Sequence, residues 1–578
     1  MSDVLGFFKK EISGQNAAIK KLVPLYEDEY FFLSGDTSFD IYFKNSDRVV
    51  IVLNGFVSLP QGSDISPNSY LDYLEELYVA KPKNFHEEIL GSYTICIYDK
   101  SSHELIIVKD HMGSRPIYFI DEQSFFVFST NLNDLVCMKF VKQEVNERKL
   151  IDFLSLRVRE NTSTFYRNIK RLAASEICTI TDCLRTTKYQ YRGGALDKGD
   201  SDSIEKFERM FHDAIKRTLQ KEKNIGILLS GGLDSSAVAA GLYRNGVKCV
   251  KTFSANYSYL PKKIKSKIDE SPYQEAVSET LGYKHMFVST EKLSPFESLK
   301  LQSRYFGEPT FFPNLFIFEK LVYAAKQEMI GTLYDGQDGD TTVSHGLERI
   351  YELYKKKNFL LLIYEVVAYA FFNGVKLSST FKFFITHIRI QLGKQVPSTV
   401  NTSMVKDSIF SKQKGLENSQ LALNKHSDKL RNPVRASAQE VNYLFFKYHQ
   451  IHTRSPFYDL PLTNFCCDLH SSWKLRHGRG RFILREYLRR NLSALIANRP
   501  GKANLSLGIA YNIENRDINL VKAELDSLHP VLANIVNRSK IEKYIHIMGE
   551  KDKLSDSIVS ALVVFYVANR WLNANRFA

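Results

Sequence analysis

The pattern of apolar and polar positions changes near residue 200. Before that point, short apolar runs separated by turn residues predict a β-layered domain. The predicted strands there cover 49–53, 92–98, 104–108, 117–120 and 125–129. After it, strand-like and helix-like runs alternate as in a doubly wound α/β domain, and beyond about residue 440 the chain is predicted to be mostly helical. We therefore expect an α/β protein with one domain at 1–195 and a second at 196–578.

The first strand of the second domain leads into the sequence GILLSGGLDSS, residues 226–236. Residues 227–229 predict a short buried strand, and 237–242 predict a helix. A glycine turn between them exposes backbone N–H groups, which together with the helix dipole form an anion site. The Asp234 carboxylate would repel a bare phosphate, so we expect a divalent cation between the two. An ordinary turn with an Asp/Ser helix cap is the alternative.

A second polar loop, Asp335-Gly336-Gln337-Asp338-Gly339-Asp340, follows the strand-like residues 330–334. A Gly- and Asp-rich loop at the end of a strand suits a cation or a phosphate. A solvated acidic turn is the alternative.

Composition limits the class of protein without selecting a substrate. A length of 578 residues predicts two to four domains, and 44% hydrophobic with 25% charged residues is normal for globular proteins. The net charge of +14 suits an acidic partner such as a nucleotide, an acidic peptide, nucleic acid or a membrane surface. It does not choose among them.

Cysteine usage and the apolar runs bear on location. The seven cysteines have no CxxC or zinc spacing, and no signal peptide begins the sequence, so we expect a reduced, cytoplasmic protein. The most apolar run, 359–375, is short for a membrane span and has Glu365 near its middle. We expect a buried helix there, with peripheral contact to a membrane or a transport partner left open.

The SGGLDSS motif resembles the pyrophosphate loop of ATP pyrophosphatases in the form typical of the asparagine synthetase family. The resemblance implies ATP and Mg²⁺ as cofactors, adenylation of a carboxylate, and attack by an amine. It implies Asp234 and Asp340 as metal ligands. The implied nucleotide contacts are Leu228, Ser230, Gly231, Gly232, Leu233, Asp234, Ser235, Ala255 and Gly336.

Residues 91–119, with Asp110, Gly113 and Pro116, resemble the glutaminase domain of class B asparagine synthetases. In that family a cysteine at residue 2 is the nucleophile, whereas this chain has Ser2, and its first cysteine is Cys96. An N-terminal serine can in principle act through its own amine. We expect instead a glutaminase-like scaffold without glutaminase activity.

Several segments resemble relatives that close an internal amide. Gln337 and Thr341 stand where asparagine synthetases keep acids, and the ending 338–346 is similar to lasso peptide cyclases. Residues 475–485 and 498–502 resemble β-lactam synthetase, which implies that Lys502 stabilises charge during acyl transfer. The same resemblance implies that Glu440 acts as, or orients, the general base, although its tyrosine partner maps to Gln337.

These resemblances lead us to expect ATP-dependent macrolactam formation in a precursor peptide. An Asp or Glu side chain would be adenylated, and the N-terminal amine would close the ring, as in lasso peptide biosynthesis. The implied partners are the precursor peptide and a leader-peptide protease or exporter, with no nucleic acid. The alternatives are an amidating synthetase of a small acid, a non-enzymatic peptide-binding scaffold, and a tRNA- or nucleotide-modifying ATP pyrophosphatase.

Overall fold

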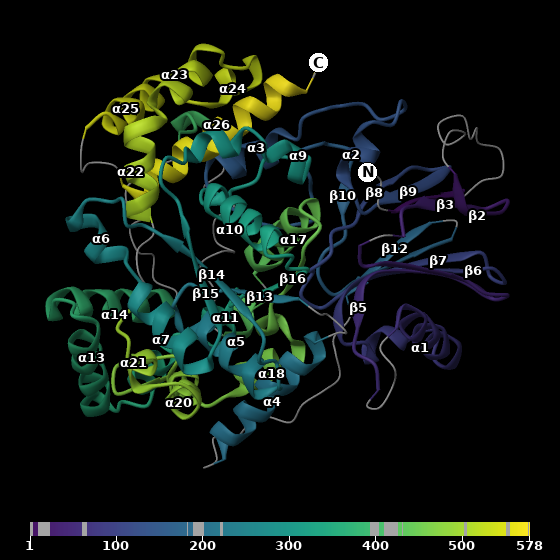
Figure 1. Ribbon diagram of the computed structural model, residues 1–578. Coiled ribbons are helices and arrows are strands. Elements are labelled where there is room, and N and C mark those ends of the chain that lie inside the picture. Colours follow the sequence, from purple (N-terminus) through teal and green to yellow (C-terminus); the bar gives the residue numbers. More distant parts are fainter. Residues whose placement is uncertain are drawn as a thin grey trace.

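A computed structural model shows a β-sandwich beside a larger α/β domain with a helical carboxyl-terminal part (Figure 1). It describes residues 4–9, 23–37, 39–60, 66–181, 183–188, 202–219, 224–392, 404–409, 426–430, 432–501, 506–550, 555–575 and 577.

The amino-terminal domain consists of two six-stranded antiparallel sheets, ordered β10-β8-β9-β1-β3-β2 and β12-β11-β7-β6-β5-β4. The strands are β1 Val4–Lys9, β2 Pro24–Glu27, β3 Phe31–Gly35, β4 Ile41–Asn45, β5 Val49–Val57, β6 Gly91–Asp99, β7 Glu104–Lys109, β8 Tyr118–Asp121, β9 Phe125–Ser129, β10 Lys170–Arg171, β11 Glu176–Ile180 and β12 Leu184–Lys188. The helices are α1 Pro67–Ala80, the 3₁₀ turn η1 Phe85–Glu88, α2 Leu132–Val136 and α3 Glu147–Leu154.

Both faces of the second sheet are buried, which explains why β5 is apolar at nearly every position. Val50 and Val52 point into the space between the sheets, where they join Phe8 of β1 in one core cluster. Val49, Ile51 and Leu53 point the other way, against α1. Alternate side chains of a strand lie on opposite faces, so a continuous apolar run is required where both faces are covered.

The second domain is built on a five-stranded parallel sheet, ordered β15-β14-β13-β16-β17. Helices α4, α5 and α7 cover one face, while α10 packs on the other and belongs to the same core cluster as α26. The strands are β13 Ile225–Leu228, β14 Lys251–Asn256, β15 Lys284–Ser289, β16 Thr332–Tyr334 and β17 His452–Arg454, and a separate hairpin has β18 Leu475–Arg476 and β19 Arg479–Gly480.

Helices make up the remainder of this domain. The first group is α4 Ser203–Thr218, α5 Leu233–Arg244, α6 Lys262–Ile268, α7 Ser271–Leu281, α8 Pro295–Leu299, α9 Gln302–Phe306, α10 Leu315–Gln327, α11 Gly339–Val343, α12 Leu347–Lys355, α13 Phe359–Asn373 and α14 Leu377–Gln391. The second group is α16 His426–Leu430, α17 Pro433–Tyr448, η3 Pro456–Tyr458, α18 Leu460–Asp468, α19 Ser471–Lys474, α20 Phe482–Asn491, α21 Ala494–Ala497, α22 Ser506–Arg516, α23 Ile518–Asp526, α24 Pro530–Ile535, α25 Arg538–Met548 and α26 Asp556–Ala574.

One helix among the described residues, Asp556–Ala574, is long and apolar enough to cross a membrane. It is 72% buried inside the protein and packs beneath α23 and α25 as part of the larger core. Its composition is therefore that of a core helix. The shorter apolar run is also helical, as α13, but much of that helix lies at the surface rather than in the core.

Buried charges join the two domains. Lys109 at the end of β7 is fully buried, and its Nζ donates to Glu440 of α17 and to the carbonyl oxygen of Leu172 at 2.9 Å. The other Glu440 oxygen accepts from Arg171 Nη1 at 2.9 Å, and Arg171 also pairs with Glu308. These four side chains, called the interdomain ion network below, alternate in sign, so each buried charge lies between opposite ones.

The predicted fold class is confirmed: a β-sandwich precedes a parallel α/β domain with a helical carboxyl-terminal part. The predicted strands fall within one to four residues of the observed bounds. Strand β12 ends at Lys188 and α4 begins at Ser203, and the predicted boundary at 195 lies outside the described residues.

We expect Glu440→Gln to destabilise the protein strongly, because the substitution leaves Lys109 and Arg171 buried with too little countercharge. Breaking a buried ion pair typically costs about 3–5 kcal/mol. The midpoint of urea unfolding should fall accordingly. In the matched control, Glu542→Gln, an exposed pair with Arg538 is lost, and the change should stay within about 0.5 kcal/mol. Equal midpoints for the two variants would contradict the role given to the network.

Candidate active site

The order of the parallel sheet reverses between β13 and β16, because the chain runs outward to β14 and β15 before returning to β16. Open α/β sheets bind ligands at such a switch point, beyond the carboxyl ends of the strands. Here the loop after β13 meets the loop after β16. A Cβ on Gly336 would lie 2.4 Å from the backbone nitrogen of Ser235, so a glycine is needed for this approach.

The loop after β13 presents backbone donors toward this point. Gly231 has a φ of 76°, a left-handed conformation that favours glycine. Gly232 is the N-cap of α5, and no side chain caps the helix. Ser230 Oγ accepts from the Gly232 N–H at 3.2 Å and lies 3.0 Å from Ser235 Oγ, which holds the turn in shape. An uncapped helix N-terminus with flanking hydroxyls is an anion site.

Arginines from the carboxyl-terminal part surround the loop. Arg481 Nη1 donates to Asp234 Oδ2 at 2.7 Å and Oδ1 at 3.0 Å, and Arg499 pairs with Glu270 and donates to the carbonyl oxygen of Gly231. Burial, reinforced by neighbouring arginines, lowers the pKa of Arg485 to about 9. Such mutual repulsion indicates that the site has an excess of positive charge, which a polyphosphate would neutralise.

Three non-glycine residues around the two loops have left-handed backbones: Asp338 and Ser344 with φ of 64°, and Arg481 with φ of 54°. Such conformations cost free energy and persist where surrounding contacts enforce them. Asp338 pairs with Arg435, and Arg481 with Asp234, so two of the three strained residues carry an ion pair beside the loops.

The two carboxylates expected to hold magnesium lie near one another. A Cβ on Gly339, the residue before Asp340, would lie 2.7 Å from Asp234 Oδ1, so the second loop meets the Asp234 carboxylate. Asp234 lines the cavity described below, whereas Asp340 is not among its lining residues. No group of three metal-binding side chains occurs among the described residues. Mg²⁺ in nucleotide sites takes one or two carboxylates and fills its other positions with phosphates and water. Two carboxylates beside an anion loop fit that donor set.

A cavity of about 700 Å³ opens from the two loops. Its wall beside β14 is apolar, with Phe253, Ala255 and Phe287, and suits a planar base. The structure brings all but one of the predicted nucleotide contacts to this cavity. Those lining it are Leu228, Ser230, Gly232, Leu233, Asp234, Ser235, Ala255 and Gly336. Gly231 supports the loop from behind, where a Cβ would lie 3.1 Å from the Glu270 carbonyl oxygen.

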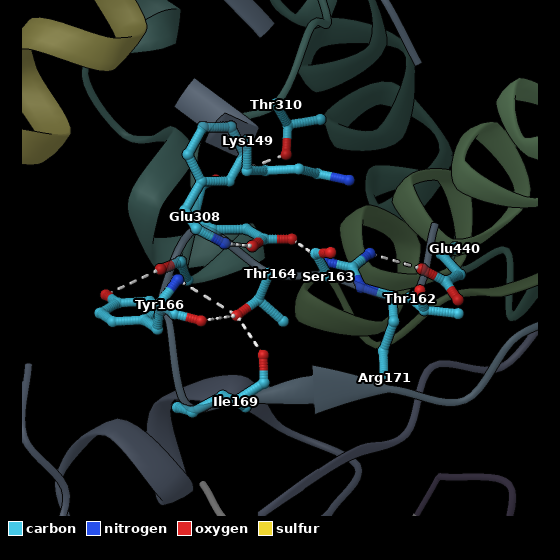
Figure 2. Close-up of polar contacts among 12 residues, drawn as sticks. Lys149, Thr162, Ser163, Thr164, Tyr166, Ile169, Arg171, Glu308, Thr310 and Glu440 are labelled. Atoms are coloured by element: carbon cyan, nitrogen blue, oxygen red, sulfur yellow. Dashed lines mark hydrogen bonds and ion pairs between the residues drawn. The ribbon is translucent and has the colours of Figure 1, made fainter. Parts of the chain in front are cut away.

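The amino-terminal domain forms part of the cavity wall. Residues 149–171 contribute Lys149, Asp152, Glu160 and Arg171 to the lining. Figure 2 shows Arg171 between Glu308 and Glu440. Glu308 also lines the cavity, and its Oε2 accepts from the Phe165 N–H at 3.0 Å. The domain expected to be a scaffold therefore also shapes the site.

Of the two residues predicted to act in acyl transfer, Glu440 and Lys502, the structure describes only Glu440. Glu440 is buried, and its two oxygens accept from Lys109 and Arg171, so the structure gives it two cations as neighbours. Gln337 lines the cavity. Lys502 lies outside the described residues, directly after Gly501 of the cavity wall.

Sequence reasoning missed Arg171, Glu308 and Arg499 as residues of the site. Arg171 follows Lys170 without a recognisable motif, and Glu308 lies more than a hundred residues from Arg171. Arg499 lies within the segment 498–502 but was not singled out there. The only available signal was the unusual Glu-Pro pair at 308–309 between two apolar stretches. Arg481 belongs to the segment 475–485 that the resemblance to β-lactam synthetase marks, and it lines the cavity.

We expect Arg481→Met to weaken ATP binding by roughly 10- to 100-fold, as calorimetry would measure, because charge-assisted hydrogen bonds contribute about 1.5–3 kcal/mol each. Arg481→Lys should recover only part of the loss, since an ammonium lacks the planar fork. The control Arg489→Met removes a surface arginine paired with Glu486 and should leave the affinity unchanged. Wild-type affinity in Arg481→Met would rule out a nucleotide at this end of the cavity.

Comparison with known proteins agrees with this architecture. A glutamine amidotransferase domain model matches residues 44–191, and an asparagine synthase model matches residues 206–414 and 446–573. Glutamine-hydrolysing asparagine synthetase 2 of Bacillus subtilis is 26% identical over 34% of this chain and 30% of its own length. A putatively assigned asparagine synthetase 2 of Methanocaldococcus jannaschii is 26% identical over 41% of this chain and 47% of its own length.

Asparagine synthetase 3 of Bacillus subtilis is 24% identical over 39% of this chain and 38% of its own length. The chain thus spans less than half the length of each of these three relatives. All three relatives are named as glutamine-hydrolysing asparagine synthetases. Because the asparagine synthase model matches more than half of its residues, the chain belongs to the asparagine synthase family.

Proposed function

We propose that this chain is an ATP-dependent carbon–nitrogen ligase that forms AMP and pyrophosphate. A carboxylate oxygen of the substrate attacks the α-phosphorus of ATP, and pyrophosphate leaves. An amine then attacks the acyl carbon, loses a proton, and AMP leaves. The observation that carries the proposal is that the uncapped amino end of α5, the arginines around it and the buried Glu308–Arg171 pair all face one cavity.

The residues have separate tasks in this proposal. The N–H groups at the start of α5 bind the phosphates, and Arg481 and Arg499 balance their charge as pyrophosphate leaves. Asp234 and Asp340 would hold Mg²⁺, which when bound supplies positive charge to the phosphates. Lys502 follows the cavity wall in sequence and is proposed to stabilise the charge that develops at the acyl carbon. Glu440 keeps Arg171 in place and thereby orients Glu308.

The amine is proposed to arrive as such instead of being cut from glutamine. The nucleophilic cysteine that the glutaminase resemblance requires at residue 2 is a serine here. The amino-terminal domain instead lends residues 149–171 to the wall of the cavity. The buried carboxylate of Glu308 is proposed to bind the protonated amine of the substrate before the reaction. Arg171 fixes the position of that carboxylate.

Two substrate classes follow from different observations. The family matches favour amidation of a small acid, as in the relatives named above. Macrolactam formation within a peptide is the second candidate, and the size and aromatic lining of the cavity favour it. Five phenylalanines line the part shared with the amino-terminal domain, which suits apolar side chains better than ammonia. They are Phe153, Phe165, Phe311, Phe312 and Phe318.

We expect ATP–pyrophosphate exchange in the presence of Mg²⁺ and a carboxylate substrate. Asp234→Ala should lower the exchange rate at least a hundredfold, since it removes a charge that positions the metal and the phosphates. The substrates to compare are aspartate, small β-amino acids, and a short Gly-leading peptide with Asp or Glu at position eight or nine. A small acid that alone supports exchange would establish amidation, and a peptide that alone does so would establish macrolactam formation.

Two further results give this experiment its controls. Asp526→Ala, which changes an exposed acid in α23, should exchange at the wild-type rate. Exchange that Asp234→Ala retains would show that the chemistry does not use this loop. Absence of exchange with every substrate, in protein that binds ATP, would leave the non-enzymatic scaffold as the better explanation.

We expect no release of glutamate from glutamine, because the chain has Ser2 in place of the nucleophilic cysteine. With the acid found above, ammonium chloride or hydroxylamine should support AMP formation, whereas glutamine at the same concentration should not. Mass spectrometry of the glutamine reaction is the measurement. Glutamate formed in step with AMP would contradict an externally supplied amine.

A further inference from the structure

The helical hairpin formed by α13 and α14 presents an apolar surface to solvent. Nearly half of the large apolar side chains that are exposed in the described part of the chain lie between residues 354 and 392. Leu360 is 86% exposed and Phe371 is 84% exposed, values that are rare for such side chains in a folded protein. Figure 1 shows the hairpin at the edge of the α/β domain, on the opposite side from the β-sandwich.

The exposed side chains on α13 form a stripe. Leu360, Tyr364 and Phe371 are spaced four and seven residues apart, so they share one face of the helix. The opposite face, with Val366 and the buried Glu365, packs on a small core made with Ile350, Phe384 and Leu475. The hairpin is therefore folded and anchored from within, and its outer apolar face is not needed for that packing.

Around the stripe the charge is mainly positive, and Lys356 pairs with Glu352 of α12 at 2.6 Å. Residues 355–392 contain Lys355, Lys356, Lys357, Lys376, Lys382 and Arg389. Glu365 is the only acid in this segment of the sequence, and it is 2% exposed and accepts from the Gly478 N–H at 2.8 Å. An apolar face with a rim of lysines and no exposed acid is complementary to an anionic surface that has an apolar interior.

These features favour a lipid bilayer over a protein partner. Lysine is depleted at protein–protein interfaces, whereas lysines beside an apolar helix face extend to lipid headgroups while their methylene groups remain in the apolar layer. Helix α13 has 15 residues, about 22 Å at 1.5 Å per residue, against about 30 Å for the hydrocarbon core. The helix is too short to span a bilayer, but it suits a position parallel to its surface.

We propose that the α13–α14 hairpin binds the surface of an anionic lipid bilayer, with the Leu360–Phe371 stripe inserted among the acyl chains and the surrounding lysines on the headgroups. The apolar stripe alone would prefer any bilayer, and the lysines add a preference for anionic lipid. The hairpin also lies against β18 and β19, just before Arg481, where Gly478 approaches the backbone of Ala368. Bilayer binding would thus place the cavity at a fixed height above the membrane, whatever its substrate.

Flotation of the full-length protein with vesicles tests this proposal. Vesicles of phosphatidylcholine mixed with phosphatidylglycerol should carry the wild-type protein upward, and phosphatidylcholine alone should carry much less. Leu360→Ser combined with Phe371→Ser should reduce binding at least tenfold. Lys357→Gln combined with Lys382→Gln should reduce it by about fivefold per lysine at low salt, and added salt should remove the difference.

Matched control variants test whether vesicle binding is specific to this surface or comes from exposed apolar and basic side chains in general. Tyr323→Ser combined with Met329→Ser changes apolar side chains that are 62% and 76% exposed at the end of α10, and Lys522→Gln combined with Lys543→Gln changes exposed lysines of α23 and α25. Both controls should float like wild type. Every substituted side chain is exposed, so thermal unfolding should not change. A tryptophan placed by Leu360→Trp should shift its fluorescence to shorter wavelength only with the anionic vesicles.

Three results would overturn the proposal. The first is an absence of flotation with either vesicle. The second is flotation that the Leu360 and Phe371 substitutions leave unchanged. The third is a stable dimer of the wild-type protein, seen by light scattering, that these substitutions dissociate while the protein fails to float, because a second copy of the chain would then cover the stripe.

Discussion

The arrangement of this protein depends on one buried chain of alternating charges, the interdomain ion network of Lys109, Glu440, Arg171 and Glu308. Charges removed from water are tolerated only when their partners hold an exact geometry, so the network tolerates little displacement of one domain relative to the other. Burial lowers the pKa of Arg171, yet the carboxylates of Glu308 and Glu440 outweigh that effect and raise it. The Arg171 guanidinium therefore stays charged, and its ion pair holds Glu308 at the cavity wall.

The same constraint explains what the amino-terminal domain contributes. Its strands make a sandwich of the type matched by glutamine amidotransferase domains, and its contact with the synthetase domain combines buried ion pairs with the packing of Phe165 and Tyr166 on Trp571. Asp40, for example, lies among Arg115, His452 and Arg454, whose charges hold the pKa of its carboxyl far below the usual value despite burial. A domain held this firmly can supply part of a substrate cavity, because its side chains keep fixed positions relative to the nucleotide loop.

The two-loop site and the outer face of the α13–α14 hairpin differ in physical character. At the switch point of the sheet, strained loops, backbone N–H groups and arginines meet at one end of the cavity. On the α13–α14 hairpin, apolar side chains remain exposed, and the small core beneath the hairpin does not include them. A site for phosphates has to exclude water to strengthen its electrostatics, whereas a surface for lipid has to remain open. Strained backbones and exposed apolar side chains both lower the stability of the fold, and each lies above a packed core.

The sequence by itself determined the fold class and the glycine turn after β13. Strand periodicity located β5 to β9, and residues 226–244 carry their strand, turn and helix in one continuous segment, because backbone N–H groups at a helix start need no distant partner. The sequence also identified the apolar run of α13, but predicted it to be buried. Only the tertiary structure decided that its face is exposed, because burial depends on which neighbours cover a helix and not on its composition. Likewise, only folding brought Arg171, Glu308 and Glu440 together from three distant segments, since long-range charge pairing leaves no periodic signal in the chain.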